Sequence, residues 1–245
     1  YNLAIGKNSL RLNTTGTNNT SVGTFSLDKN TTANNNTAYG YGVLNENTTS
    51  SSNTGVGYAA LISNTTGAEQ VAVGAESLDA NTTGSVNTAI GYAALSDNTT
   101  GSSNVAVGKA ALGDNTTADN NTAVGRDAMR LNTTGSENVA VGSYALDAQT
   151  DASENTAVGY QALTATTGAY NSAFGRKALL TNSTGTHNTS IGRETMYDNT
   201  TGSHNTALGN EALANNTTAS NNVAVGSASM PVSYTHLRAH ETAVN

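Results

Sequence analysis

Apolar and polar positions alternate along this chain within a unit that returns every 17 residues. We number positions in the unit from its glycine, which is slot 0. The interval shortens once, to 16 residues, and then returns to 17. Fourteen copies at a short fixed period predict a solenoid. The slot 0 glycines are Gly6, Gly23, Gly40, Gly57, Gly74, Gly91, Gly108, Gly125, Gly142, Gly159, Gly175, Gly192, Gly209 and Gly226.

Two positions of the unit are apolar in every copy. Slot −1 holds mostly β-branched residues, such as Val107, and slot +4 holds Leu or Met, such as Leu112. Slot −2 holds only Ala, Ser or Gly. Because side chains alternate along a strand, slots −3 and −1 share one face and slot −2 lies on the other. We therefore predict that slots −3, −1 and +4 point into one core, and that a neighbouring chain approaches the small face.

The segments between these positions are rich in turn residues. Glycine at slot 0 serves one turn, and an Asn-Thr-Thr-Gly box, as in residues 98–101, serves another. No helix of ordinary length fits between such breakers. The expected fold is all-β: a parallel β-solenoid of about 14 coils over residues 1–230, with two short strands per coil. The irregular stretch 147–171 is interpreted as a loop deletion with local repacking, with a functional bend as the alternative.

Asparagine precedes the first expected strand in all copies except one, where Gln70 replaces it. Stacked coils place equivalent side chains about 4.8 Å apart. The sequence therefore predicts a ladder of amide hydrogen bonds along the stack.

Composition narrows the function classes. The formal net charge is −7 and charged residues are 11% of the chain, which argues against nucleic acid or an anionic membrane surface as partner. The chain has no cysteine, so cysteine usage does not indicate whether the protein works in an oxidising or a reducing compartment. No run of about 18 apolar residues occurs, so no membrane insertion is expected in this fragment. The first residue falls in mid-repeat, and we expect a piece of a longer chain.

The strand motif Asn-x-x-Ala/Val-Gly resembles the head repeats of trimeric autotransporter adhesins, the YadA-like or haemagglutinin-type repeats. The best matches are residues 104–108 and 222–226, and the resemblance covers residues 1–230. It implies a left-handed β-roll in which three chains pack side by side, at the cell surface or attached to the outer membrane. The family's coil is usually shorter, and the longer coil with its Asn-Thr-Thr-Gly box also resembles the repeat shafts of phage tail fibres.

Candidate sites are few. We expect no enzyme, no catalytic residue, no cofactor and no bound metal. His187 and His204 occupy the same slot in adjacent coils and should stack on one surface, but two histidines without a third ligand do not make a zinc site. A surface-binding stripe is predicted at slot +1, with packing over the strand end as the alternative, and a trimer interface at slot −2. The stripe is Tyr41, Tyr58, Tyr92 and Tyr160, and the interface is Ala72, Ala89, Ala106, Ala123 and Ala140.

Three function classes remain. The first is a structural or adhesive fibre segment of a bacterial surface adhesin, a rigid homotrimer with a host-surface protein or glycan as receptor, or else a virion tail shaft. The second is an ice- or surface-binding solenoid, which the adjacent threonines of the turn box do not favour because their side chains diverge. The third is a solenoid enzyme, for which no cluster of His or carboxylates breaks the repeat.

The last segment, residues 231–245, differs in kind from the repeat. It contains the chain's one proline and two of its four histidines. Residues 231–242 resemble one reading frame of an adapter used in preparing DNA sequencing libraries. We therefore expect a non-native tail without a place on the solenoid.

Overall fold

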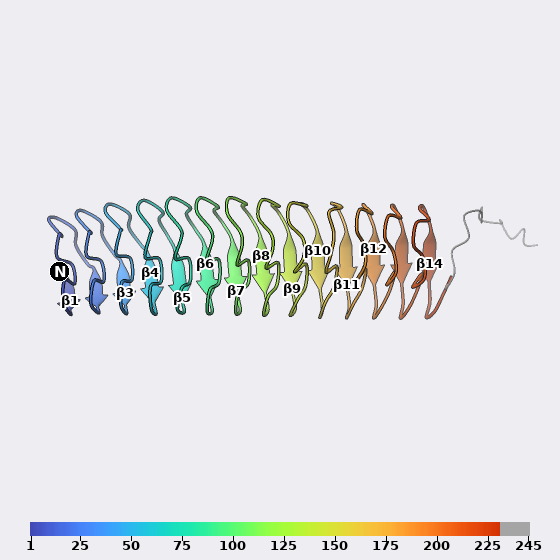
Figure 1. Ribbon diagram of the computed structural model, residues 1–245, viewed down its shortest axis with the longest axis horizontal. Helices are drawn as coiled ribbons and strands as arrows, with labels where there is room; N and C mark the ends of the chain where they lie inside the picture. The colour runs from blue at the N-terminus through green and yellow to red at the C-terminus, as the bar shows by residue number, and fades with distance from the viewer. Residues whose placement is uncertain (231–245) are drawn as a thin grey trace, which may run out of the picture.

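The computed structural model describes residues 1–230, and these form a long parallel β-solenoid (Figure 1). Each coil contributes one strand of three residues, and the fourteen strands pair in chain order in a single parallel sheet. The predicted fold is confirmed, whereas the expectation for the tail lies outside the described residues. The strands are β1 (Leu3–Ile5), β2 (Thr20–Val22), β3 (Thr37–Tyr39), β4 (Thr54–Val56), β5 (Val71–Val73), β6 (Thr88–Ile90), β7 (Val105–Val107), β8 (Thr122–Val124), β9 (Val139–Val141), β10 (Thr156–Val158), β11 (Ser172–Phe174), β12 (Thr189–Ile191), β13 (Thr206–Leu208) and β14 (Val223–Val225).

The register follows the repeat without a slip. Residues 17 apart face each other, as Val105 and Thr122 do. Across the shortened coil the offset is 16, and Thr156 pairs with Ser172. There Thr166 stands where most other coils have asparagine, and its hydroxyl accepts a hydrogen bond from Asn182 at 3.1 Å. The missing residue therefore lies in the turn, as the loop-deletion interpretation predicted.

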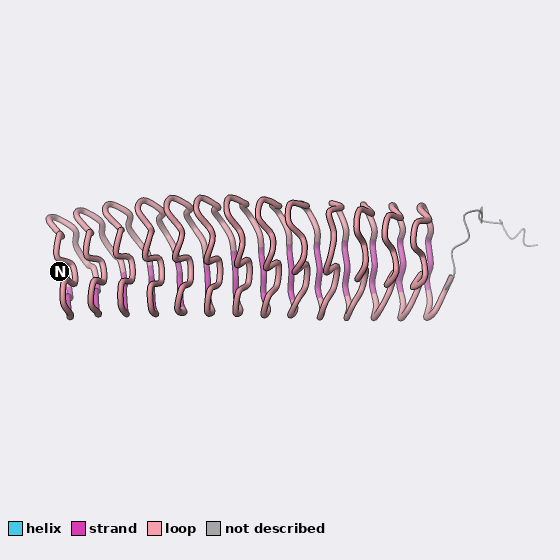
Figure 2. Tube along the Cα trace, viewed as in Figure 1, coloured by secondary structure: helices cyan, strands magenta, loops and turns pink. Residues whose placement is uncertain are grey.

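The second apolar segment of each coil is not a strand, so the expectation of two strands per coil is wrong (Figure 2). Its backbone has positive φ at slots +2 and +4, for example 51° at both Ala110 and Leu112. That geometry disfavours β-branched residues. Accordingly, no Val, Ile or Thr occurs at either slot, which explains why slot +4 uses Leu and Met while slot −1 uses Val and Ile.

The glycine at slot 0 is required by both conformation and space. Gly108 has φ of +138°, and a Cβ atom there would overlap the carbonyl oxygen of Gly125 in the next coil. The same close approach repeats along the stack, so these glycines form a continuous column.

The inside and the outside of the sheet are the reverse of the prediction. Slot −2 points inward, and Ala106 is fully buried, as is Leu112 at slot +4. Slots −3 and −1 point outward and are half-buried or exposed. The reason is the narrow width of the coil: leucine from the opposite wall already fills the interior, so only a small residue fits across from it.

Where alanine at slot −2 is replaced, a residue at slot +3 changes with it. Where slot −2 is serine, slot +3 of the same coil is also polar: Ser21 donates to the carbonyl of Ser26 at 2.9 Å, and Ser190 to that of Thr195 at 2.9 Å. Gly55 replaces the usual alanine because Val43 of the preceding coil is unusually large. A Cβ at position 55 would overlap Cγ1 of Val43.

This pairing predicts a compensating double substitution. Gly55→Ala alone should destabilise by about 1–3 kcal/mol through overpacking. Val43→Ala alone should cost about 1–3 kcal/mol through the cavity that it leaves. The double variant restores the Ala–Ala arrangement of other coils and should lie within about 1 kcal/mol of the parent, a coupling that a double-mutant cycle measured by urea unfolding detects. Additive losses would show that the two side chains do not share one space.

Two asparagine ladders bind the coils together. At slot −4 the main-chain N–H of Asn104 donates to Oδ1 of Asn87 at 2.9 Å, and its own Nδ2 donates to the carbonyl of Ala118 at 2.8 Å. The predicted ladder is thus confirmed, with the main chain as the usual donor. A second ladder at slot +7 was predicted only as a turn: Nδ2 of Asn98 donates to Oδ1 of Asn81 at 2.8 Å. Buried amides with satisfied partners fix the stacking of the coils.

Candidate functional site

The outward face of the sheet is a repeating surface that runs along the described solenoid. We call its slot −1 column the outer stripe. It runs over all fourteen strands and contains apolar residues throughout. Within the column, Ile90 is 40% exposed and Tyr39 is 60% exposed. The outer stripe is Ile5, Val22, Tyr39, Val56, Val73, Ile90, Val107, Val124, Val141, Val158, Phe174, Ile191, Leu208 and Val225.

A second outward column at slot −3 flanks the outer stripe. It holds Thr, Val, Ser or Leu, and none of the strands β1–β14 contains a charged residue. Parallel sheets are normally covered on both faces. In this single chain one face packs on the core and the other meets solvent. Contiguous exposed apolar surface of this kind marks an interaction site.

The predicted trimer interface lies elsewhere than expected. Ala72, Ala89, Ala106, Ala123 and Ala140 are each 0% exposed within one chain. They pack inside the solenoid and cannot contact a second chain while the coil is intact. The prediction that this small face meets a neighbour is wrong. The alternation of side chains separates two faces but does not say which one the coil encloses.

Only two of the four tyrosines of the predicted stripe contact each other. Tyr41 and Tyr58 stack with ring centroids 5.5 Å apart, and Phe25 meets Tyr41 edge-on at 5.9 Å. Tyr92 lies two coils beyond Tyr58, with Ala75 between them, and Tyr160 lies four coils further along. All four tyrosines are 45–57% exposed.

The two histidines stack as predicted. The rings of His187 and His204 have centroids 4.8 Å apart, and Tyr170 extends the column at 4.8 Å from His187. Within residues 1–230, no group of three or more His, Cys, Asp or Glu side chains is placed to hold a metal ion. Tyr170, His187 and His204 are exposed, and their rings form a stacked row on the surface.

Asp147 is a half-buried carboxylate in the coil of β9. Burial raises the pKa of its carboxyl to about 6, and repulsion from Asp127 adds to the rise while Arg130 opposes it. Among the described residues, its Oδ1 is one of three buried side-chain oxygens without a hydrogen-bond partner. Because the pKa in the folded state lies above that in the unfolded state, the folded chain holds this proton more tightly.

Stability should therefore fall as the pH rises from about 4 to about 6, since the folded state then loses its preferred proton. Asp147→Asn should be more stable than the parent at about pH 7.5, and the advantage should shrink at about pH 4. Urea unfolding at both pH values checks this. Asp151→Asn, at an exposed position in the following turn, is the control and should show no such pH dependence. An equal effect of Asp147→Asn at both pH values would contradict the assignment.

Comparison with known proteins assigns no family. No protein-family model, no curated protein sequence and no solved structure gives a significant match to the chain. The described part of the chain has no helical segment with the length and apolarity needed to cross a membrane. What the fold defines is the class: an all-β, parallel β-solenoid repeat protein with a coil of 17 residues.

Proposed function

We propose that this chain is a rigid segment of a surface fibre, the head or shaft of an adhesin, in which three copies pack through their outer stripes. The trimeric state, the adhesive role and the extracellular location are taken from the resemblance to adhesin head repeats. The alternative is a tail-fibre shaft, which would place the same trimeric solenoid on a virion.

The outer stripe carries this proposal. A column of apolar residues on one sheet face, repeated over fourteen uncharged strands, is unfavourable in water and has no partner within residues 1–230. A second copy is the partner whose surface matches it in length and period. Parallel copies related by rotation about the fibre axis bring identical coils to the same height, as closed cyclic symmetry requires.

Light scattering on the purified chain tests the assembly. The expected mass is about 74 kDa, three times the chain mass of 24.8 kDa. The triple substitution Val73→Lys, Val107→Lys and Val141→Lys should yield folded monomers. These side chains already face outward, so the solenoid tolerates them, whereas three buried charges per chain prevent close packing of the copies.

A matched control places the same charges on the turn edge. Thr66, Thr100 and Thr134 are exposed, and their replacement by lysine should leave the mass of the oligomer unchanged. A parent protein that is monomeric at micromolar concentration would contradict the proposal.

One observation favours a second candidate, an ice- or surface-binding solenoid. Slot −3 holds an outward threonine in eight strands, each followed two residues later by a residue of the outer stripe. These threonines share one column on the outward sheet face with the valines of strands such as β5 and β7, whereas those of the turn box lie in turns. A monomeric parent that shows thermal hysteresis would support this candidate over the fibre.

A further inference from the structure

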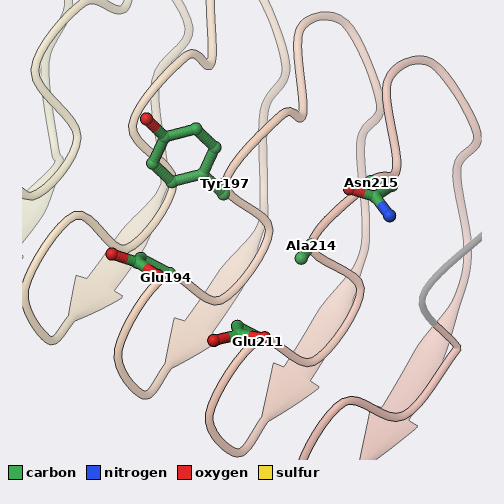
Figure 3. A pocket seen from close by; sticks show the side chains of 5 residues that line it. All are labelled: Glu194, Tyr197, Glu211, Ala214 and Asn215. Atoms are coloured by element: carbon green, nitrogen blue, oxygen red, sulfur yellow. The ribbon is translucent and has the colours of Figure 1, made fainter.

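A pocket of about 310 Å³ opens on the flank of the solenoid, between the coils of β12 and β13 (Figure 3). Its lining combines one aromatic ring, two carboxylates and one amide. The lining residues are Glu194, Tyr197, Glu211, Ala214 and Asn215. The pocket lies outside the outer stripe and outside the predicted tyrosine stripe.

The ring of Tyr197 forms one wall. Nζ of Lys177, from the preceding coil, lies 5.9 Å from the ring centroid and holds one face of the ring by a cation–π contact. In the following coil the equivalent position is Ala214, whose small side chain leaves the space beside the ring open (Figure 3). The second face of the ring is thus available to a ligand.

The carboxylates of the pocket are held in place by arginines. Glu194 binds Arg176 at 2.9 Å and Arg193 at 3.3 Å, and Glu211 binds Arg193 at 2.5 Å. Two guanidinium groups therefore balance the two carboxylates, so the pocket has no excess of negative charge that would attract a cation. The carboxylate oxygens keep free lone pairs that accept further hydrogen bonds.

We propose that this pocket binds a carbohydrate, one or two pyranose units of a glycan. The apolar C–H face of the sugar stacks on Tyr197 above Ala214. Its hydroxyl groups donate to Glu194 and Glu211 and meet the amide of Asn215. An apolar platform with a few fixed polar groups is the usual composition of a small-ligand site. Binding of a sugar here is independent of the proposed function. The further inference that this sugar is the receptor of the adhesin rests on the proposed function.

Saturation-transfer NMR on the full chain, with methyl glycosides of glucose, galactose, mannose, N-acetylglucosamine and N-acetylgalactosamine, tests the proposal. At least one glycoside should bind at about 1 mM, the strength that its size allows. Tyr197→Ala removes the platform, and Ala214→Leu fills the space beside it. Each change should weaken binding by about tenfold or more while thermal unfolding stays unchanged.

Two other tyrosines serve as controls. Tyr144 lies under Arg126 at 4.6 Å, a similar cation–π pair away from the pocket, and Tyr144→Ala should not alter binding. Tyr58→Ala examines the tyrosine stripe: if this variant loses binding while Tyr197→Ala retains it, the pocket is not the site. Absence of signal from every glycoside, or binding of spermidine without any glycoside, would also overturn the proposal.

Light scattering on the same samples separates the two proposals. A trimer that binds no sugar rejects the pocket alone, and a monomer that binds sugar rejects the fibre alone.

Discussion

Ala106→Gln is expected to unfold the coils around β7, whereas Val107→Gln, at the next residue, leaves the solenoid folded. Ala106 is 0% exposed and lies in the core cluster beside Leu112. Glutamine there adds volume to a filled interior and brings an amide without partners. Together the overpacking and the buried polar group should cost about 3–5 kcal/mol. The side chain at position 107 points to solvent, so the same substitution there stays within about 1 kcal/mol for the single chain.

Hydrogen exchange measures the effect where it occurs. Because each coil of a solenoid contacts only its neighbours, the loss should be confined to coils near β7, with the two ends still protected. Adding Ala89→Gln and Ala123→Gln should extend the unprotected region to neighbouring coils. If Val107→Gln unfolds these coils and Ala106→Gln does not, the assignment of inner and outer faces is reversed.

The inner face could have been recognised from its variation along the repeat. Slot −1 changes from Val to the much larger Tyr39 and Phe174, a range of volumes that a packed core does not tolerate. Slot −2 varies only slightly, and its changes are matched by the residue that packs against it, as with Gly55 and Val43 of the preceding coil. Hydrophobicity alone ranks valine above alanine as a core residue and so led to the wrong face.

Other features were predictable to different degrees. The period, the glycine column and the strand register follow from the spacing of Gly108 and its equivalents, because a repeat that stacks must keep one register. The ladder at slot +7 was missed because asparagine is also an ordinary turn residue. The pocket at Tyr197 could not be predicted, since it depends on how Lys177 orients one ring against a small residue in the next coil.

The second large effect is expected from Asn115→Asp, which changes one atom of the buried slot +7 ladder. Asn115 is 0% exposed, and its Nδ2 donates to Oδ1 of Asn98 at 2.8 Å and to the carbonyl of Ala118 at 3.2 Å. Its Oδ1 accepts from Nδ2 of Asn132 at 3.1 Å. A carboxylate at position 115 can still accept the hydrogen bond from Asn132 but can no longer donate to Asn98 or Ala118. Its new oxygen instead faces Oδ1 of Asn98 and the carbonyl oxygen of Ala118. We expect a loss of about 3–5 kcal/mol at neutral pH, since a buried charge is left without a partner.

The pH dependence identifies the cause. Burial and facing oxygens raise the pKa of the new carboxyl above its unfolded value of about 3.9. The protonated form can donate again, so part of the lost stability should return as the pH falls toward about 4. Urea unfolding at about pH 7.5 and about pH 4 measures this recovery relative to the parent. Asn120→Asp, at an exposed position of the same turn, is the control and should change stability little at either pH. If Asn115→Asp and Asn120→Asp were equally stable at neutral pH, the ladder would tolerate a charge at its centre. The ladder would then not hold the coils together, and the sheet alone would do so.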